Sequence, residues 1–300
     1  MNAEEIKEVL SLPPDERPVA IMIEVPNRVL GCQTYTFPQL EQISAACREA
    51  DVKLHMDGAR LWEIEPYYQS TSGKTFSDIT ALFDSVYVSF YKVLRGITGA
   101  MLVHNDPTFI AEARVWQRRA GGNPFTLMYE IIDCERGFNE NSGTFARKRD
   151  KMVDIVTRVT AATERYRTEG GCSVVSFEPE KPTCCQILTV FSGFTVSELE
   201  AARDKVQEKM DVRVFEKLKG KKTVDEIMKG DRVECEQKAG DGEQDEQKVG
   251  GDKEVEMHEG EDRRHLMEWM IMSVTEKINT QVWVDAYCTL CEELIAMKKS

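Results

Sequence analysis

Short apolar runs alternate with helix-like segments over the first ninety residues, and this alternation constrains the fold more than any other feature of the chain. The runs AIMIEV (20–25), VKLHM (52–56) and SVYVSF (85–90) each have the length and composition of a buried strand. Pro38 opens an amphipathic helix between the first two runs, and a polar, helix-like stretch separates the second from the third. Strands separated by helices predict a right-handed α/β sheet with parallel strands.

A different order of elements follows residue 165. Two strand-like runs and a helix are followed by two more runs and a last helix, at CSVVSF (172–177), CCQILTVF (184–191), 197–210, DVRVF (211–215), LMEWMIMSV (266–274) and 282–299. This order is typical of a compact α+β unit. We therefore predict a larger α/β domain with a mainly parallel sheet in residues 1–165 and a smaller α+β domain in residues 166–300.

An acidic segment interrupts the smaller domain at about 217–264. Thirteen acids against seven bases between Lys229 and Arg264 contribute −6 to the formal charge of −13, and large apolar residues are almost absent. Such a segment buries too little surface to offset the entropy of ordering it. We expect a disordered insertion, either a solvated loop or a regulatory docking tail.

Composition excludes several classes of function. No apolar run reaches the eighteen residues needed to span a bilayer, and the acidic start MNAEEIKEVL lacks the order of a signal peptide. Nine cysteines without regular spacing predict thiols in the cytoplasm, and CTLC (288–291) lacks a second pair at zinc spacing, so no metal is expected. The charge of −13 disfavours nucleic acid and anionic lipid as partners.

Two charged residues stand where a parallel sheet binds its ligands, beyond the carboxyl ends of strands. Asp57 ends the second strand-like run and Lys92 follows the third. Pyridoxal phosphate requires two groups from a protein: a carboxylate that keeps its ring nitrogen protonated and a lysine that holds its aldehyde. Pairing of Asp57 with Lys92 or Arg60 for structural reasons explains the same pattern.

Four motifs in order distinguish the chain further: HMDGARLW (55–62), FDSVYVSFYK (83–92), RGITGAMLV (95–103) and FIAEARVWQRRAGGNPF (109–125). Together they resemble the threonine aldolase and aromatic amino acid β-eliminating lyase family, which are pyridoxal-phosphate enzymes of fold type I. The resemblance is close over residues 20–143, although Cys32 stands where a second glycine is usual. It implies an incomplete large domain of fold type I followed by the smaller α+β domain.

The resemblance also implies roles for individual residues. Lys92 resembles the Schiff-base lysine, Asp57 the partner of the pyridine nitrogen, and Arg60 the arginine that binds the α-carboxylate of the substrate. A planar guanidinium suits that task because it donates two parallel hydrogen bonds. Ser89 is expected to contact the cofactor phosphate, and a solvated serine at a strand end is the alternative.

Other residues near these motifs have simpler interpretations. Gly96 and Gly99 either let the backbone approach the lysine closely or form a plain turn. His55 is expected to be packed rather than to act as a base. We expect Trp116 and the tryptophans of the smaller domain to lie in the core.

The function implied by the resemblance is cleavage of the Cα–Cβ bond of a β-hydroxy amino acid such as threonine, which gives glycine and an aldehyde. The alternatives are β-elimination from an aromatic or cysteine-like amino acid, and a truncated, non-catalytic relative that binds an intact subunit. The family pattern implies a homodimer or homotetramer.

Two features of the family have no match in the chain. The phosphate-gripping loop and a ring-stacking histidine normally lie upstream of AIMIEV, so we expect an N-terminal segment to be absent, through the gene model or by degeneration. A second carboxylate-binding arginine has no match in LMEWMIMSV either, because Arg263 and Arg264 precede that run. Weak binding of the cofactor by the chain as written is therefore expected.

Overall fold

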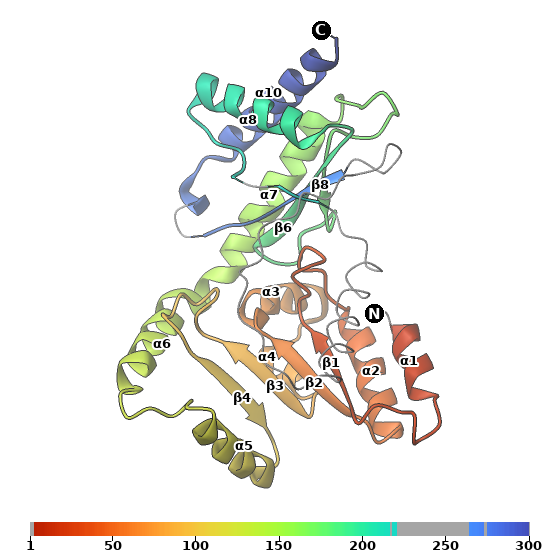
Figure 1. Cartoon of the computed structure of the whole chain (residues 1–300), viewed down its shortest axis with the longest axis vertical. Coiled ribbons are helices and arrows are strands. Elements are labelled where there is room, and N and C mark those ends of the chain that lie inside the picture. Colours follow the sequence, from red (N-terminus) through yellow and green to blue (C-terminus); the bar gives the residue numbers. More distant parts are fainter. Residues whose placement is uncertain (1–2, 217, 221–263, 273–274, 300) are drawn as a thin grey trace, which may run out of the picture. The chain divides into compact units, whose positions relative to one another are not determined.

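The computed structural model describes residues 3–216, 218–220, 264–272 and 275–299 (Figure 1). Its strands are β1 (Ala20–Glu24), β2 (Lys53–Gly58), β3 (Ser85–Ser89), β4 (Ala100–His104), β5 (Val175–Glu178), β6 (Gln186–Ser192), β7 (Lys219–Gly220) and β8 (Arg264–Met270). Its α-helices are α1 (Ala3–Leu10), α2 (Phe37–Glu49), α3 (Leu61–Ser72), α4 (Phe76–Thr80), α5 (Pro107–Arg119), α6 (Met128–Asn141), α7 (Phe145–Thr163), α8 (Val196–Met210) and α10 (Thr280–Lys299). Short 3₁₀ helices occupy Ser142–Thr144 and Thr275–Lys277.

The chain divides into two compact units. The first comprises Met1–Val159, Phe177–Leu188 and Glu268–Val284, and the second comprises Thr160–Ser176, Thr189–Met267 and Asp285–Ser300. All of the residues for which the sequence predicts a functional role fall in the first unit.

The sheet of the first unit has the strand order β1-β2-β3-β4. Strands β1, β2 and β3 are parallel, as predicted, and β4 runs antiparallel to β3. The register places Glu24 beside Asp57, and Asp57 beside Tyr87. Three polar side chains therefore stand in a row across the carboxyl ends of the parallel strands.

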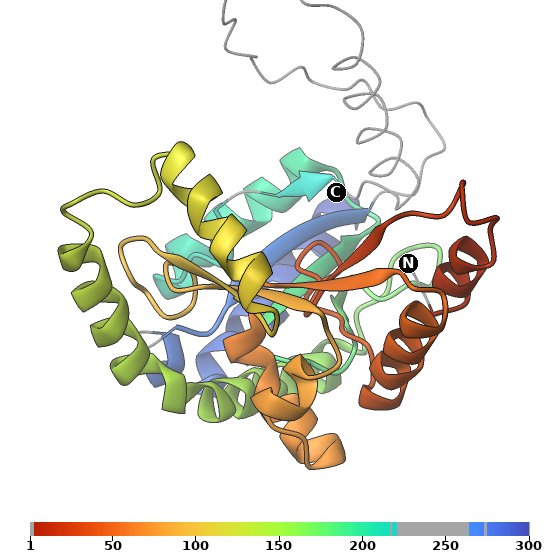
Figure 2. The same ribbon diagram turned by 90° about the horizontal axis from the view of Figure 1, so that it is seen from below.

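The core of the first unit follows from the two-residue period of these strands. Ile23, Met56 and Val88 are at most 5% exposed and join one apolar cluster with Leu40 of α2 and Ile64 of α3. Figure 2 shows α2 and α3 on the same side of the sheet. Because neighbouring side chains of a strand point to opposite faces, Asp57 and Tyr87 point away from these helices.

Helix α2 forms where the sequence predicts it, and its start is well defined. Thr36 and Gln39 form a reciprocal capping box, and Pro38 occupies the first turn, where its missing N–H costs nothing. Leu40, Ile43 and Cys47 are buried at helical spacing, as expected.

Strand β4 was not predicted as a strand of the sheet from periodicity. It forms a hairpin with β3, and the side chains of Met101, Leu102 and Val103 are each at least 40% exposed. The apolar side chains of β4 are therefore not covered by other described elements.

The second sheet has the order β5-β6-β8-β7, in which β7 and β8 are antiparallel. One predicted strand, DVRVF (211–215), is wrong. Asp211 adopts a left-handed conformation as the C-cap of α8, and residues 212–215 belong to no strand. Val214 and Phe215 are adjacent and both buried, so side-chain packing rather than strand pairing accounts for their apolar character.

The predicted acidic insertion, about 217–264, lies for the most part outside the described residues. At its edges, Lys219 pairs with Leu266 and Gly220 with His265. The insertion therefore leaves and re-enters the described part of the chain at neighbouring strands.

The tryptophans divide into two groups. The expectation that Trp116 lies in the core is wrong, because its side chain is 65% exposed on α5, where Arg119 lies over the ring at 5.0 Å. Helix α5 has no buried residue, so no described segment covers this face. Trp269 and Trp283 are half-buried and stack at a centroid distance of 4.7 Å.

No helix in the described part of the chain is both long and apolar enough to cross a membrane. The eight cysteines that the structure describes are free thiols, and Cys291 of CTLC is buried within α10. Among the described residues, no group of three potential ligands is arranged to hold a metal ion.

Candidate functional site

Asp57 is the last but one residue of β2, just before the turn that leads into α3. Its backbone carbonyl accepts from the amide of Val25, and Oδ1 accepts from the amide of Ala59 at 3.0 Å. Within the described residues the carboxylate forms no ion pair, so neither Lys92 nor Arg60 is its structural partner. Oδ2 is left to accept a further hydrogen bond on the face opposite the helices.

Arg60 is the N-cap residue of α3, three residues after Asp57. Its Nε donates to Oε1 of Gln186 at 3.1 Å and lies 3.9 Å from Oε1 of Glu63. The side chain is 13% exposed, and its two Nη atoms have no partner in the part of the chain that the structure describes. The terminal fork of the guanidinium is therefore available to a ligand.

Lys92 lies in the loop of the β3–β4 hairpin, which we define as the lysine loop, Phe90 to Gly99. The loop closes on itself, because the amides of Phe90 and Gly96 donate to the carbonyls of Gly99 and Phe90, both at 2.9 Å. Lys92 is half-buried, and its Nζ lies 5.7 Å from the ring centroid of Tyr91. It makes no hydrogen bond or ion pair with the described residues, so the amine is free to react.

Helix α6 holds the lysine loop from one side. Asn141, 5% exposed, donates from Nδ2 to the carbonyl of Leu94 at 3.0 Å, and Asp133 accepts from the amide of Ile97 at 2.6 Å. Gly137 permits the close approach, since a Cβ there would lie 2.5 Å from the oxygen of Leu94. The conformation of the loop is thus fixed by a helix more than thirty residues downstream.

The two glycines of the lysine loop belong to the turn rather than to a contact with the lysine. Gly99 has φ +103°, and a Cβ on it would lie 2.5 Å from Sγ of Cys134. A Cβ on Gly96 would meet the carbonyls of Phe90 and Thr98 within the loop itself. Of the two interpretations offered by the sequence, the structure favours the plain turn.

Ser89 is fully buried at the end of β3. Its hydroxyl donates to the carbonyl of Ala59 at 2.6 Å, and its own carbonyl accepts from Nε1 of Trp62. Ser89 therefore links the end of β3 to the turn after Asp57. The solvated alternative is wrong, because the side chain has no exposed surface.

His55 is packed on β2, as the sequence predicts. Its Nδ1 lies 2.7 Å from Oγ of Ser85 on the neighbouring strand. Burial lowers the pKa of His55, although the nearby carboxylate of Asp57 acts in the opposite direction. The neutral imidazole is thus favoured beside the site.

Tyr87 is a site residue that the sequence analysis missed. It stands beside Asp57 in the register of β2 and β3, and its hydroxyl lies 3.5 Å from that of Tyr91. Burial, the Tyr91 hydroxyl and the charge of Asp57 raise the pKa of Tyr87 to about 12. Its position could have been found from the two-residue period, which puts residues 85, 87 and 89 on one face.

Two cavities lie elsewhere on the first unit. One, of about 960 Å³, adjoins the lysine loop at Phe90, Tyr91 and Thr98 and is otherwise lined largely by apolar residues of β4 and α6. The size suits a small molecule, but Asp57, Arg60 and Lys92 are not among the lining residues.

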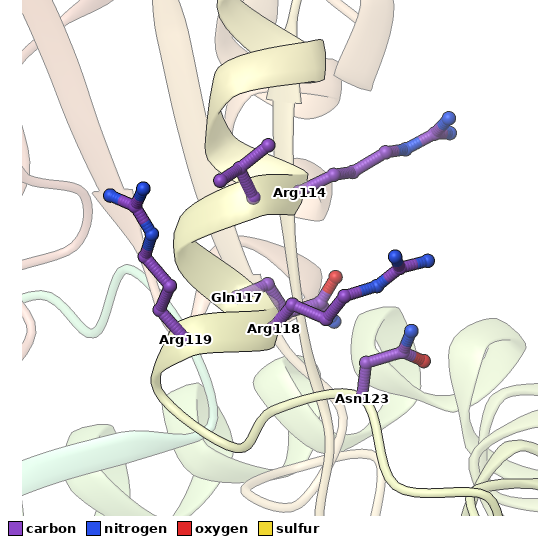
Figure 3. A pocket seen from close by; sticks show the side chains of 6 residues that line it. Arg114, Gln117, Arg118, Arg119 and Asn123 are labelled. Carbon is purple, nitrogen blue, oxygen red and sulfur yellow. The ribbon is translucent and has the colours of Figure 1, made fainter.

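A second cavity, of about 530 Å³, is lined by six residues at the end of α5: Arg114, Val115, Gln117, Arg118, Arg119 and Asn123. Figure 3 shows Arg119 projecting to the opposite side of the helix from Arg114 and Arg118. The guanidinium groups therefore do not converge on a single anion.

Comparison with known proteins finds similar sequences and similar folds. The model of the beta-eliminating lyase family matches residues 1–136. A low-specificity L-threonine aldolase of Candida albicans is 36% identical over 84 residues, which are 28% of this chain and 21% of that protein.

Two solved structures resemble the chain over most of its length. A provisionally named L-allo-threonine aldolase from Listeria monocytogenes has a TM-score of 0.71 and 29% identity, covering 96% of this chain and 64% of its own. A provisionally named aromatic amino acid beta-eliminating lyase/threonine aldolase from Exiguobacterium has a TM-score of 0.71 and 25% identity, covering 98% and 65%.

These matches define the class of protein. The fold is that of the fold type I pyridoxal-phosphate enzymes, with a mainly parallel sheet in the first unit. Residues 1–136 match the model of the beta-eliminating lyase family, and the relatives that share this part of the chain include low-specificity L-threonine aldolases. The chain spans about two thirds of the length of the two solved structures and a fifth of the Candida protein.

Proposed function

We propose that this protein is a pyridoxal-phosphate-dependent lyase of the threonine aldolase type, which converts a β-hydroxy amino acid into glycine and an aldehyde. One observation carries the proposal. Asp57, Arg60 and Lys92 lie at or beyond the carboxyl ends of the adjacent strands β2 and β3, and each carries atoms that form no hydrogen bond or ion pair with the described residues: Oδ2, the Nη fork and Nζ. The named relatives are threonine aldolases, which supports the same activity.

The donor set fits the cofactor. Lys92 would hold the aldehyde carbon covalently, and Oδ2 of Asp57 would accept a hydrogen bond from the protonated ring nitrogen. Pyridoxal phosphate, when bound, supplies a ring that takes up the electrons released at the substrate Cα. An ionised carboxylate keeps the ring nitrogen protonated because it favours the positive charge, which a neutral amide does not.

The protein's own residues divide the work between binding and proton control. Arg60 would bind the substrate α-carboxylate through two parallel hydrogen bonds from its Nη atoms. Lys92 would hold the cofactor aldehyde through its amine, which forms no hydrogen bond or ion pair with the described residues. Tyr87 stays protonated at neutral pH and would donate a hydrogen bond beside Asp57 rather than act as a base.

The phosphate contact of Ser89 stays a prediction. The proton of its hydroxyl is engaged by the carbonyl of Ala59, so contact with a phosphate dianion requires that bond to break. In this proposal residues 1–165 form the cofactor-binding part and residues 166–300 the smaller part. The cytoplasmic location also stays a prediction.

We propose that the protein is a homodimer or homotetramer. Support comes from large apolar side chains that are exposed on one part of the first unit: Met101, Val103, Val115, Trp116, Phe125, Met128, Tyr129, Ile131 and Ile132. Exposed apolar surface of this extent is typical of association sites. Light scattering coupled to size-exclusion chromatography would measure the mass, and a monomer would contradict the proposal.

The cofactor assignment is tested by trapping. The protein is incubated with pyridoxal phosphate at high concentration, reduced with borohydride and digested, and the labelled peptide is identified by mass spectrometry. We expect the label on Lys92 and its loss in Lys92→Ala, whereas Lys53→Ala, which alters an exposed lysine on β2, should keep it. A label distributed over surface lysines and unchanged in Lys92→Ala would overturn the assignment.

The reaction is tested by product analysis. Release of glycine and acetaldehyde from threonine, absent in Lys92→Ala, is the expected result. Formation of an oxo acid and ammonia from an aromatic or cysteine-like amino acid would instead support β-elimination. A protein that is labelled at Lys92 yet releases no product from either substrate class would support the non-catalytic alternative.

A further inference from the structure

A chain of polar contacts surrounds the inner edge of Arg60. Nε of Arg60 donates to Oε1 of Gln186, and Nε2 of Gln186 donates to Oε1 of Glu268. Glu268 in turn forms an ion pair with Arg28 at 2.9 Å. These four residues come from the start of α3, from β6, from β8 and from the loop after β1, so the contacts connect four segments of the first unit that are distant in sequence.

Glu63, three residues after Arg60, is a second neighbour of the guanidinium. It is fully buried, and its Oε2 accepts from the thiol of Cys185 at 3.0 Å. Its Oε1 has no hydrogen bond among the described residues and lies 3.9 Å from Nε of Arg60. Burying an acid with an unsatisfied oxygen costs free energy of folding. Here that acid lies one helical turn from the arginine.

Both contacts act on the same edge of the guanidinium. A guanidinium can bind a carboxylate side-on, through Nε and one Nη, or end-on, through both Nη atoms. Oε1 of Gln186 accepts from Nε directly, and Oε1 of Glu63 lies 3.9 Å from the same nitrogen. Only the end-on fork then remains for a ligand.

We infer that Gln186 and Glu63 are positioning residues that hold Arg60 by its Nε edge and reserve the Nη fork for the α-carboxylate of the substrate. The inference rests on the proposed function, and it adds a determinant of specificity. A carboxylate accepts from both Nη atoms, whereas a carboxamide offers one acceptor and sets its NH₂ against the second Nη. A fixed Arg60 therefore selects free amino acids over their amides.

The geometry is tested without the cofactor. The Nε–H signal of Arg60 in NMR spectra is assigned by its loss in Arg60→Lys, and its exchange with water is measured in Gln186→Met. Methionine keeps the length of the glutamine side chain and removes its acceptor. We expect exchange to become at least tenfold faster, while Gln69→Met, an exposed position on α3, should leave it unchanged.

The selectivity is tested on the protein labelled reversibly with pyridoxal phosphate. The concentrations of threonine and of threoninamide that half-saturate the change in visible absorption give a preference ratio for the carboxylate. Gln186→Met and Glu63→Gln should each lower this ratio by about tenfold, and Gln69→Met should not. If Gln186 and Glu63 served only the fold, their substitution would weaken the binding of both ligands by the same factor. The preference ratio would then stay unchanged.

The outcomes separate this inference from the function on which it rests. If the parent protein does not attach the cofactor at Lys92, the proposed function fails and the inference fails with it. If the parent attaches it and prefers threonine, but both variants keep the parent's ratio and exchange rate, only the inference is overturned. A variant that fails to fold, as judged by circular dichroism, is replaced by Gln186→Leu for the same two measurements.

Discussion

The end of β2 with the turn that follows it, Asp57 to Arg60, and the lysine loop after β3 are two parts of one candidate site, yet they are held in different ways. The turn is fixed by strand register and by side chains of Gln186 and Glu63 that contact Arg60. The lysine loop is fixed through its backbone, whose amides and carbonyls are bound by α6. Apart from the contact of the Ser89 hydroxyl with the carbonyl of Ala59, the candidate binding groups and Lys92 therefore have different supports, so mutations away from Ser89 should affect them separately.

The largest expected effect comes from the turn. Asp57→Asn keeps an oxygen that can accept from the amide of Ala59, so the turn should fold unchanged. Attachment of the cofactor at Lys92 should persist, because it needs only the lysine and the aldehyde. Turnover should fall on the order of 100-fold, since the charge that keeps the ring nitrogen protonated is lost.

Steady-state kinetics of glycine release and borohydride trapping measure the two effects separately. Asp84→Asn, at the amino ends of the parallel strands, where Oδ2 accepts from the amide of Leu54, serves as a control for the loss of one carboxylate away from the site. Turnover near the parent rate in Asp57→Asn would mean that Asp57 serves only the fold.

The lysine loop should respond in the opposite way. Asn141→Ala removes the donor to the carbonyl of Leu94 and leaves that oxygen buried without its partner. We expect a loss of about 1–3 kcal/mol in the free energy of unfolding. Labelling of Lys92 by pyridoxal phosphate should slow, while the exchange of the Arg60 Nε–H with water should not change.

Urea unfolding and the time course of labelling provide the measurements, with Asn123→Ala at an exposed position as the matched control. A change in Arg60 exchange as large as the change in Lys92 labelling would show that the two parts of the site are not independent.

The smallest effect concerns the dependence of stability on pH. Burial raises the pKa of Glu63 above its ordinary value, so the folded state binds this proton more tightly than the unfolded state. The free energy of unfolding should therefore decline as pH rises from about 4.5 toward the folded-state pKa. Glu63→Gln removes this decline.

Unfolding in urea between pH 4 and pH 8 tests this expectation. The difference in stability between Glu63→Gln and the parent should grow in favour of the variant as pH rises, while Arg60 loses its fixed position. Glu41→Gln, at an exposed position on α2, is the control. A difference that is constant with pH would mean that Glu63 has the same pKa in both states.

Local patterns were sufficient for much of the framework. The two-residue period and the intervening helix predicted the parallel strands, and the placement of Asp57 and Lys92 after two adjacent strands followed from the topology alone. The two-residue period gave a wrong prediction at DVRVF (211–215), because apolar side chains such as Val214 and Phe215 can be buried by packing in a segment that joins no sheet. The prediction that Trp116 lies in the core was wrong for a related reason. An apolar side chain is buried only where another element covers it.

The sequence by itself determined which residues the first unit offers for chemistry, since their types and their positions at strand ends are local properties. Only the tertiary structure decided how those residues are held. Gln186 is 126 positions from Arg60 and Asn141 is 47 positions from Leu94, so no local pattern connects either pair. Hydrogen bonds of this kind depend on packing that brings distant segments within 3.1 Å, and that packing is a property of the whole fold.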